Sequence, residues 1–183
     1  MRISQPIVAC HHPQAEVLNR MLAQGFSSLG DDDFERRSHF IDGRFENLYL
    51  DADRLPGVAE ILAFARGQAQ ALLSSGRATG LGVPIDADQP LRIGFWINAM
   101  QPGQSTSRHA HEECDELLSG VYYIRSPAAA GDILFHEPPF ETRVRPEPGL
   151  MLLFPPSLEH SVETNRSDQQ RLSIAFNIGP DLR

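Results

Sequence analysis

Three histidines in the second half of the chain have the spacing expected of metal ligands. His109 and His111 are two residues apart, and in a strand side chains at this spacing leave the backbone on the same face. Imidazole is the commonest side-chain ligand for borderline metals, so a rigid pair can occupy two neighbouring positions around one ion. The best candidate for a third ligand is His160, because it follows an apolar run ended by prolines and falls at an expected strand start. Two surface histidines would give the same His-x-His pattern, so the prediction depends on what surrounds it.

The last apolar stretch of the chain contains a candidate site for an anion. Apolar and polar residues alternate from Arg171 to Ile178, which predicts a strand with one apolar and one polar face. The polar face carries Arg171 and Ser173, and a fixed guanidinium beside a hydroxyl matches a small carboxylate ligand. A half-exposed strand would show the same alternation, so the hypothesis requires the polar face to line a cavity.

The elements around these residues are predicted to be short strands. The expected strands are Leu91 to Ala99, Leu118 to Ile124, Ile133 to Glu137, Thr142 to Arg145 and Leu150 to Phe154. Short strands separated by glycine and proline are typical of a barrel or a sandwich. Trp96 and Asn98 fall on one face of the first strand, and they would shape a substrate pocket if that face lines the cavity.

Two amphipathic helices are predicted ahead of these strands. One runs from Pro13 to Gly25 and the other from Leu55 to Ser74, each with apolar residues at helical spacing. Between them, Gly43 to Leu50 is predicted to be a strand, and the charged segment from Gly30 to Arg37 a solvated loop. We expect the helices to pack on the outer face of a sheet and to cover the apolar side of strands such as Leu172 to Ile178.

Length and composition limit the class of protein. A chain of 183 residues suits one domain, so we expect a single domain over residues 1–183, with residues 1–80 as a supporting region and residues 91–178 as the core. The net charge of −8 argues against nucleic acid as a partner. No apolar run is long enough to span a bilayer, and the first residues do not resemble a secretion signal. The two cysteines, Cys10 and Cys114, are too few for a disulfide framework. These features predict a cytoplasmic protein.

Five motifs follow one another between residues 91 and 178. They are His109-Ala110-His111, Leu118-Ser119-Gly120-Val121-Tyr122-Tyr123-Ile124, Pro148-Gly149-Leu150-Met151-Leu152-Leu153-Phe154-Pro155, His160-Ser161-Val162 and Arg171-Leu172-Ser173-Ile174-Ala175-Phe176-Asn177. In this order they resemble a bacterial and phage group of 2-oxoglutarate- and iron(II)-dependent oxygenases. Ahead of these motifs only the layout of the chain is similar.

The resemblance implies a mainly β fold with flanking helices, namely a double-stranded β-helix (a cupin-like jelly roll) preceded by two N-terminal helices. It also implies a dioxygenase that uses iron(II) and the co-substrate 2-oxoglutarate to oxidise a small-molecule or peptide substrate with molecular oxygen. His109, His111 and His160 would bind the iron in such a protein.

The same resemblance assigns residues to the co-substrate. Arg171 and Ser173 would bind the distal carboxylate of 2-oxoglutarate. The resemblance also suggests a phenol near that carboxylate, and Tyr122 and Tyr123 must point to opposite faces of their strand. We expect Tyr123 to fill this role because it shares its face with Ser119.

One position departs from the wider superfamily, whose motif is His-x-Asp or His-x-Glu followed by a distal histidine. Either three histidines bind the metal here, or a shifted frame makes His111 and Glu113 the pair, and assistance from Asp115 stays open. We favour three histidines because the similar group carries His-x-His. Replacing an anionic ligand by a neutral one leaves the iron more positive and should raise its reduction potential.

Other functions agree with the same residues. A cupin-like three-histidine dioxygenase would use no 2-oxoglutarate, because its substrate ligates the metal directly while an arginine holds the substrate carboxylate. A non-enzymatic barrel would bind a metal or a small carboxylate without oxygen chemistry. In a purely structural alternative the histidines never meet. The substrate is not defined by the sequence, and a homodimer is compatible with it.

Overall fold

The structure is a computed structural model that describes residues 7–41, 44–75, 89–111 and 115–182. These residues form a mainly β structure with two α-helices, so the predicted class is confirmed at this level. The elements are β1 (Val8–His11), α1 (Ala15–Ser27), β2 (Arg36–Ile41), β3 (Arg44–Tyr49), α2 (Val58–Ser74), β4 (Leu91–Met100), β5 (Thr106–His109), β6 (Leu118–Arg125), β7 (Ile133–Glu137), β8 (Phe140–Val144), β9 (Leu150–Phe154), β10 (His160–Val162) and β11 (Arg171–Pro180).

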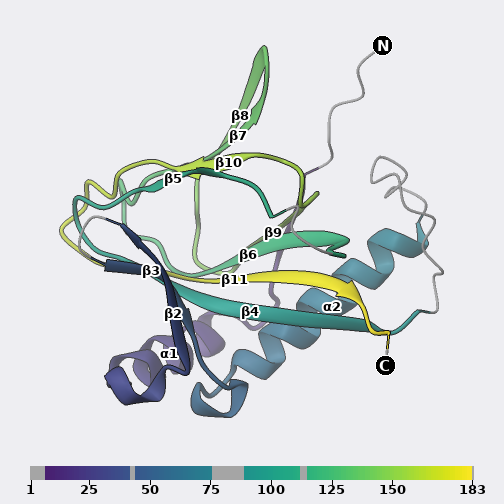
Figure 1. Cartoon of the computed structure of the whole chain (residues 1–183). Helices are drawn as coiled ribbons and strands as arrows, with labels where there is room; N and C mark the ends of the chain where they lie inside the picture. Colours follow the sequence, from purple (N-terminus) through teal and green to yellow (C-terminus); the bar gives the residue numbers. More distant parts are fainter. Residues whose placement is uncertain (1–6, 42–43, 76–88, 112–114, 183) are drawn as a thin grey trace.

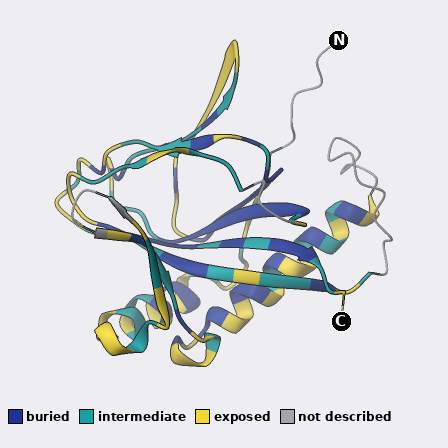
Figure 2. Ribbon diagram, viewed as in Figure 1, coloured by how far each residue is buried: buried dark blue, intermediate teal, exposed yellow. Residues whose placement is uncertain are grey.

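The strands form two antiparallel sheets that face each other (Figure 1). The larger sheet has seven strands in the order β1-β9-β6-β11-β4-β3-β2, and the smaller has four in the order β5-β10-β7-β8. Both sheets mix strands from distant parts of the sequence, so residues far apart along the chain become neighbours. Strands β7 and β8 form a hairpin that projects from the body of the molecule, and much of its surface is exposed (Figure 2).

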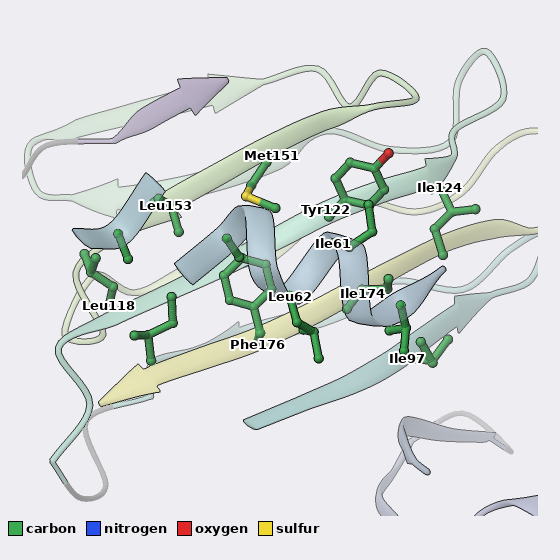
Figure 3. Close-up of a cluster of buried hydrophobic side chains, with 14 of the residues drawn as sticks. Ile61, Leu62, Ile97, Leu118, Tyr122, Ile124, Met151, Leu153, Ile174 and Phe176 are labelled. Carbon is green, nitrogen blue, oxygen red and sulfur yellow. The ribbon is translucent and has the colours of Figure 1, made fainter. Parts of the chain in front are cut away.

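Strand β11 lies at the centre of the larger sheet and has the alternation that its sequence predicts. It pairs with β4 on one side and with β6 on the other. Its apolar side chains are completely buried in the core beneath the helices, where Ile61 and Leu62 of α2 lie close to Ile174 and Phe176 (Figure 3). The helices therefore cover the outer face of this sheet, and the opposite, polar face of β11 is turned toward the smaller sheet.

A buried polar contact connects the first helix to the larger sheet. The hydroxyl of Tyr122 on β6 donates a 2.7 Å hydrogen bond to the side-chain oxygen of Asn19 on α1. Burial raises the pKa of Tyr122 to about 12, so the phenol keeps the proton that it donates. Because neighbouring residues of a strand point to opposite faces, Tyr122 on the helix side leaves Tyr123 on the inner side of the sheet.

Two local predictions were wrong. The first helix does not end at Gly25 but continues to Ser27, and a Cβ at Gly25 would come within 3.0 Å of Leu55, so the glycine permits close packing rather than ending the helix. The charged segment from Gly30 to Arg37, expected to be a loop throughout, ends in the first two residues of strand β2, which pairs with β3 at the edge of the larger sheet. Charged side chains are common on such edges, and here they concealed the start of a strand.

Neither α-helix in the described part of the chain combines the length and apolar character that crossing a membrane requires.

The packing of β6 against β11 predicts how two glycines respond to alanine. A Cβ at Gly120 would lie 2.4 Å from the Phe176 ring and 2.8 Å from the carbonyl oxygen of Leu152. We expect Gly120→Ala to lower the free energy of unfolding by about 1–3 kcal/mol, because the core cannot expand without strain. Gly94→Ala is the matched control, since a Cβ on this strand glycine meets nothing within 4 Å. Urea denaturation of the two variants measures the difference, and equal losses would contradict this account of the core.

Candidate metal centre and its cavity

Three histidine rings converge where the smaller sheet faces the larger one. In the antiparallel pairing of β5 with β10, His109 and His160 stand opposite each other, and their ring centroids are 4.4 Å apart. His111 follows the end of β5, and its ring lies 4.9 Å from that of His109 and 5.2 Å from that of His160. One nitrogen from each ring lies within 4.8 Å of the other two. This arrangement could hold one metal ion.

Backbone carbonyl groups fix the orientation of two of these rings. Nδ1 of His109 lies 2.8 Å from the carbonyl oxygen of Ser107, and Nδ1 of His160 lies 3.0 Å from that of Leu158. A carbonyl oxygen can only accept, so each Nδ1 carries the proton and each Nε2 keeps a free lone pair. Metal-binding histidines are commonly held in this way.

The protonation state of the cluster also suits a metal. Burial and the neighbouring His109 lower the pKa of His160 to about 3. Burial, with smaller contributions from His109 and His39, lowers the pKa of His111 to about 4. Both rings are therefore neutral near pH 7, which is the form of imidazole that binds metal ions.

Packing and hydrogen bonds hold the segments that carry the histidines. His111 lies beyond the last residue of β5, so it is not in the strand that we predicted, but its backbone N–H donates to the carbonyl of Pro156 over 2.9 Å. The rings of Phe135 and Phe154 pack against His160, with centroids 6.0 and 4.9 Å away. His160 is 5% exposed as a result.

The cluster lines a cavity of about 270 Å³ between the two sheets. The polar face of β11 forms much of one wall, and its lining residues are Arg171, Ser173, Ala175 and Asn177. The alternation found in the sequence therefore separates a cavity face from a core face, as the anion-site hypothesis requires.

One end of the cavity is rich in hydrogen-bond donors. Arg171 is 4% exposed, and its Cζ atom lies 5.1 Å from the centre of the Tyr123 ring. The Tyr123 hydroxyl is buried and has no hydrogen-bond partner among the described residues. Burial raises the pKa of Tyr123, although the charge of Arg171 opposes the shift, so the phenol stays protonated and can donate. With Ser173 also in the lining, this end has the groups expected for binding a carboxylate.

The other end of the cavity is aromatic and includes residues that the sequence did not reveal. Trp96 lies 5.6 Å from His111 and 6.0 Å from Tyr49, measured between ring centroids. Asn98, predicted to shape the pocket, is in the lining between the two ends, opposite Ser173 in the pairing of β4 with β11, and its amide donates to Asn47 over 3.1 Å. The β2–β3 hairpin contributes His39, Glu46, Asn47 and Tyr49 to the lining. The alternation of Asn47 and Tyr49 was the only available signal, and it pointed to a strand but not to a cavity.

Other candidate ligands are placed elsewhere or lie outside the described residues. The carboxylate of Asp115 makes an ion pair with Arg92 and is not part of the histidine cluster. The ring of His136 contacts the hydroxyl of Ser161 at 2.9 Å and is not part of the histidine cluster. Glu113 and Cys114 lie outside the described residues, so the alternative ligand frame through Glu113 stays a hypothesis.

Comparison with known proteins agrees with this chemistry. Residues 94–144 and 136–177 match the model of a family described as "Putative 2OG-Fe(II) oxygenase". The match spans the strand-rich half of the chain, from before the histidine pair to beyond Ser173. The resemblance inferred from the motifs is confirmed, and the match supports an oxidoreductase of the iron(II)- and 2-oxoglutarate-dependent class. The two alternatives without 2-oxoglutarate are not favoured.

Solved structures with a similar fold include other oxygenases. A prolyl-4-hydroxylase from Pseudomonas putida is 16% identical, with a TM-score of 0.68 over 96% of this chain and 94% of that one. A viral collagen prolyl hydroxylase from Paramecium Bursaria Chlorella virus-1, in complex with 2-oxoglutarate, is 14% identical, with a TM-score of 0.64 over 94% of both chains. A non-heme alpha ketoglutarate dependent carbocyclase from nogalamycin biosynthesis is 13% identical, with a TM-score of 0.67 over 96% of this chain and 79% of that one. No curated protein matches the sequence.

The family cofactors fit the groups found here. Iron(II) needs nitrogen or oxygen ligands with free lone pairs, and the histidine cluster offers them. The dicarboxylate 2-oxoglutarate needs donors at a distance from the metal, and the end of the cavity that contains Arg171 supplies them, including the unpartnered hydroxyl of Tyr123.

Metal binding can be measured through the only tryptophan of the chain, because Trp96 lies next to His111. We expect iron(II) or manganese(II), added without oxygen, to quench its fluorescence with a stoichiometry of one ion per chain. His160→Ala should weaken the affinity on the order of 100-fold or more, because it removes one of three ligands. His136→Ala is the control, since this histidine lies on the neighbouring strand outside the cluster. Equal affinities in the two variants would exclude His160 as a ligand.

Proposed function

We propose that this oxygenase holds iron(II) through the Nε2 atoms of His109 and His160 and through the ring of His111. The observation that carries the proposal is that three histidine rings, two of them with Nδ1 directed at a backbone carbonyl, meet in the same cavity as a buried arginine. Three protein ligands leave other positions around the ion open for the co-substrate and for oxygen. No described carboxylate belongs to the cluster, so the described residues of the cluster would add no negative charge to the metal.

We propose further that Arg171, Ser173 and Tyr123 bind the distal carboxylate of 2-oxoglutarate. Arg171 would provide two parallel N–H donors to the carboxylate, and the two hydroxyls would donate to its remaining lone pairs. An arginine that is 4% exposed is well suited to this role, because its charge is little screened by water. The unused hydroxyl of Tyr123 would gain the partner that it lacks.

In this proposal each part of the cavity has one task. Bound iron(II) would supply the redox chemistry in which oxygen converts 2-oxoglutarate to succinate and carbon dioxide while the substrate is oxidised. Arg171 orients the co-substrate relative to the histidines, and the apolar side chains of Val121, Ile133 and Phe154 in the lining exclude water from the reacting groups. The substrate then reaches the metal from the side of Trp96, whose ring lies next to His111, because the end that contains Arg171 is filled by the co-substrate.

The finer features of the fold belong to the same proposal. The two facing sheets would be a double-stranded β-helix preceded by two helices, within a single domain over residues 1–183 that has its core at residues 91–178. The protein would act in the cytoplasm on a small molecule or a peptide side chain, without nucleic acid. A homodimer remains compatible with this function.

The release of succinate tests the proposed function directly. Protein loaded with iron(II) should convert 2-oxoglutarate to succinate in the presence of oxygen, slowly without substrate and faster with it. A three-histidine dioxygenase that ligates its own substrate would consume oxygen without forming succinate. A metal sensor would bind the ion and consume no oxygen. Either outcome would replace the proposal.

The role of Arg171 predicts a selective loss of co-substrate affinity. Arg171→Ala should raise the Kd for 2-oxoglutarate by roughly 10- to 100-fold, because a charge-assisted pair of hydrogen bonds is lost, and should leave metal affinity unchanged. Arg125→Ala is the matched control, since this arginine on β6 bonds to Gln170 and is not in the cavity lining. Calorimetric titration measures both variants, and an unchanged Kd in Arg171→Ala would remove this residue from the site.

A further inference from the structure

The guanidinium of Arg171 has a fixed partner besides its expected ligand. Its Nη1 atom donates a 2.7 Å hydrogen bond to the carbonyl oxygen of Gly131, in the turn between β6 and β7. The guanidinium plane also lies near the ring of Tyr123. A guanidinium has five donors in one rigid plane, so one bond to a backbone carbonyl and one ring contact together set the direction of the remaining donors.

Only glycine fits at position 131. Its φ angle is +88°, a conformation that other residues rarely adopt, and a Cβ there would lie 2.2 Å from the carbonyl oxygen of Glu163. The obstructing atom is backbone, so it cannot move aside as the end of a side chain could. Any larger residue must displace the turn, and the carbonyl that Arg171 contacts would move with it.

The turn itself is tied to the segment that follows β10. The N–H of Glu163 donates to the carbonyl of Asp132 over 3.0 Å, and the carboxylate of Glu163 accepts from Arg143 on β8 over 2.8 Å. The position of the Gly131 carbonyl therefore depends on contacts with strands of the smaller sheet, whereas Arg171 belongs to the larger one. The bond between them fixes the arginine across the two sheets.

We propose that Gly131 is a positioning residue for co-substrate binding: its carbonyl holds the guanidinium of Arg171 in the direction that receives the distal carboxylate of 2-oxoglutarate. This inference rests on the proposed function of Arg171. It assigns a role to a glycine that contacts neither metal nor co-substrate. It also explains why the conformation of this turn matters to the site.

Two 2-oxo acids distinguish positioning from general damage. 2-Oxoglutarate carries the distal carboxylate, whereas 2-oxobutanoate has the same metal-binding end and lacks that group. In manganese(II)-loaded protein, Gly131→Ala should raise the Kd for 2-oxoglutarate about tenfold and leave the affinities for 2-oxobutanoate and for the metal within about twofold. A loss that is equal for both acids would show a merely structural effect and would overturn the proposal.

Two comparisons make the test specific. Gly57→Ala introduces a similar backbone strain, since Gly57 has a φ of +90°. Gly57 lies at the start of α2, on the far side of the larger sheet. The selectivity of this variant for 2-oxoglutarate over 2-oxobutanoate should therefore equal that of the wild type. In an Arg171→Ala background, Gly131→Ala should cause no further loss of 2-oxoglutarate affinity, because the group that it positions is absent. An additional loss there would also overturn the proposal.

Separate outcomes identify which claim fails. If Arg171→Ala alone leaves 2-oxoglutarate affinity unchanged, the proposed function of Arg171 is wrong. If Arg171→Ala weakens binding and Gly131→Ala does not, only the positioning role is wrong. Should Gly131→Ala fail to fold, Glu163→Gln loosens the same turn while keeping glycine, and we expect at least a threefold loss of selectivity for 2-oxoglutarate over 2-oxobutanoate. Unchanged selectivity in that folded variant would contradict the proposal.

Discussion

The alternation of side chains along β11 is the constraint on which the rest of the structure depends. Because successive residues of a strand point to opposite faces, one strand provides both part of the helix-covered core and part of the cavity wall. Ile174 and Phe176 are completely buried on the core side, while Arg171 and Ser173 line the cavity. A shift of one residue in the pairing with β4 or β6 would exchange the two faces. It would put a guanidinium in the apolar core, so the energy of the core also fixes the positions of Arg171 and Ser173.

The smaller sheet places the histidines relative to that wall. The register of β5 with β10 sets His109 opposite His160, and carbonyl groups two residues before each ring select the tautomer that leaves Nε2 free. The cluster therefore takes a form suited to a metal ion from protein contacts alone. Three histidine ligands would give the ion less negative charge than a set containing a carboxylate, and this should favour the reduced form of the metal.

Part of the fold and of the candidate site could be predicted from the sequence, because it depends on short-range periodicity. The two faces of β11 follow from the two-residue period of a strand, and that period is visible locally. The same period suggested the pair at His109 and His111, but His111 lies beyond the end of β5 and is held by its bond to Pro156 instead. Other features depend on contacts between distant segments. The need for glycine at position 131 arises from the carbonyl of Glu163, and the contribution of Tyr49 to the cavity arises from the pairing of a predicted strand, β3, near the edge of the larger sheet. No local sequence pattern indicates these contacts, because the contacting residues are distant in the sequence and become neighbours only in the folded chain.

The most direct test of the metal centre is the anomalous diffraction of iron in crystals grown without oxygen and with 2-oxoglutarate. We expect one iron peak within bonding distance, about 2.0–2.2 Å, of one nitrogen each of His109, His111 and His160, with the distal carboxylate of 2-oxoglutarate against Arg171. Iron bound elsewhere, or bound to these rings with the carboxylate directed away from Arg171, would contradict the account.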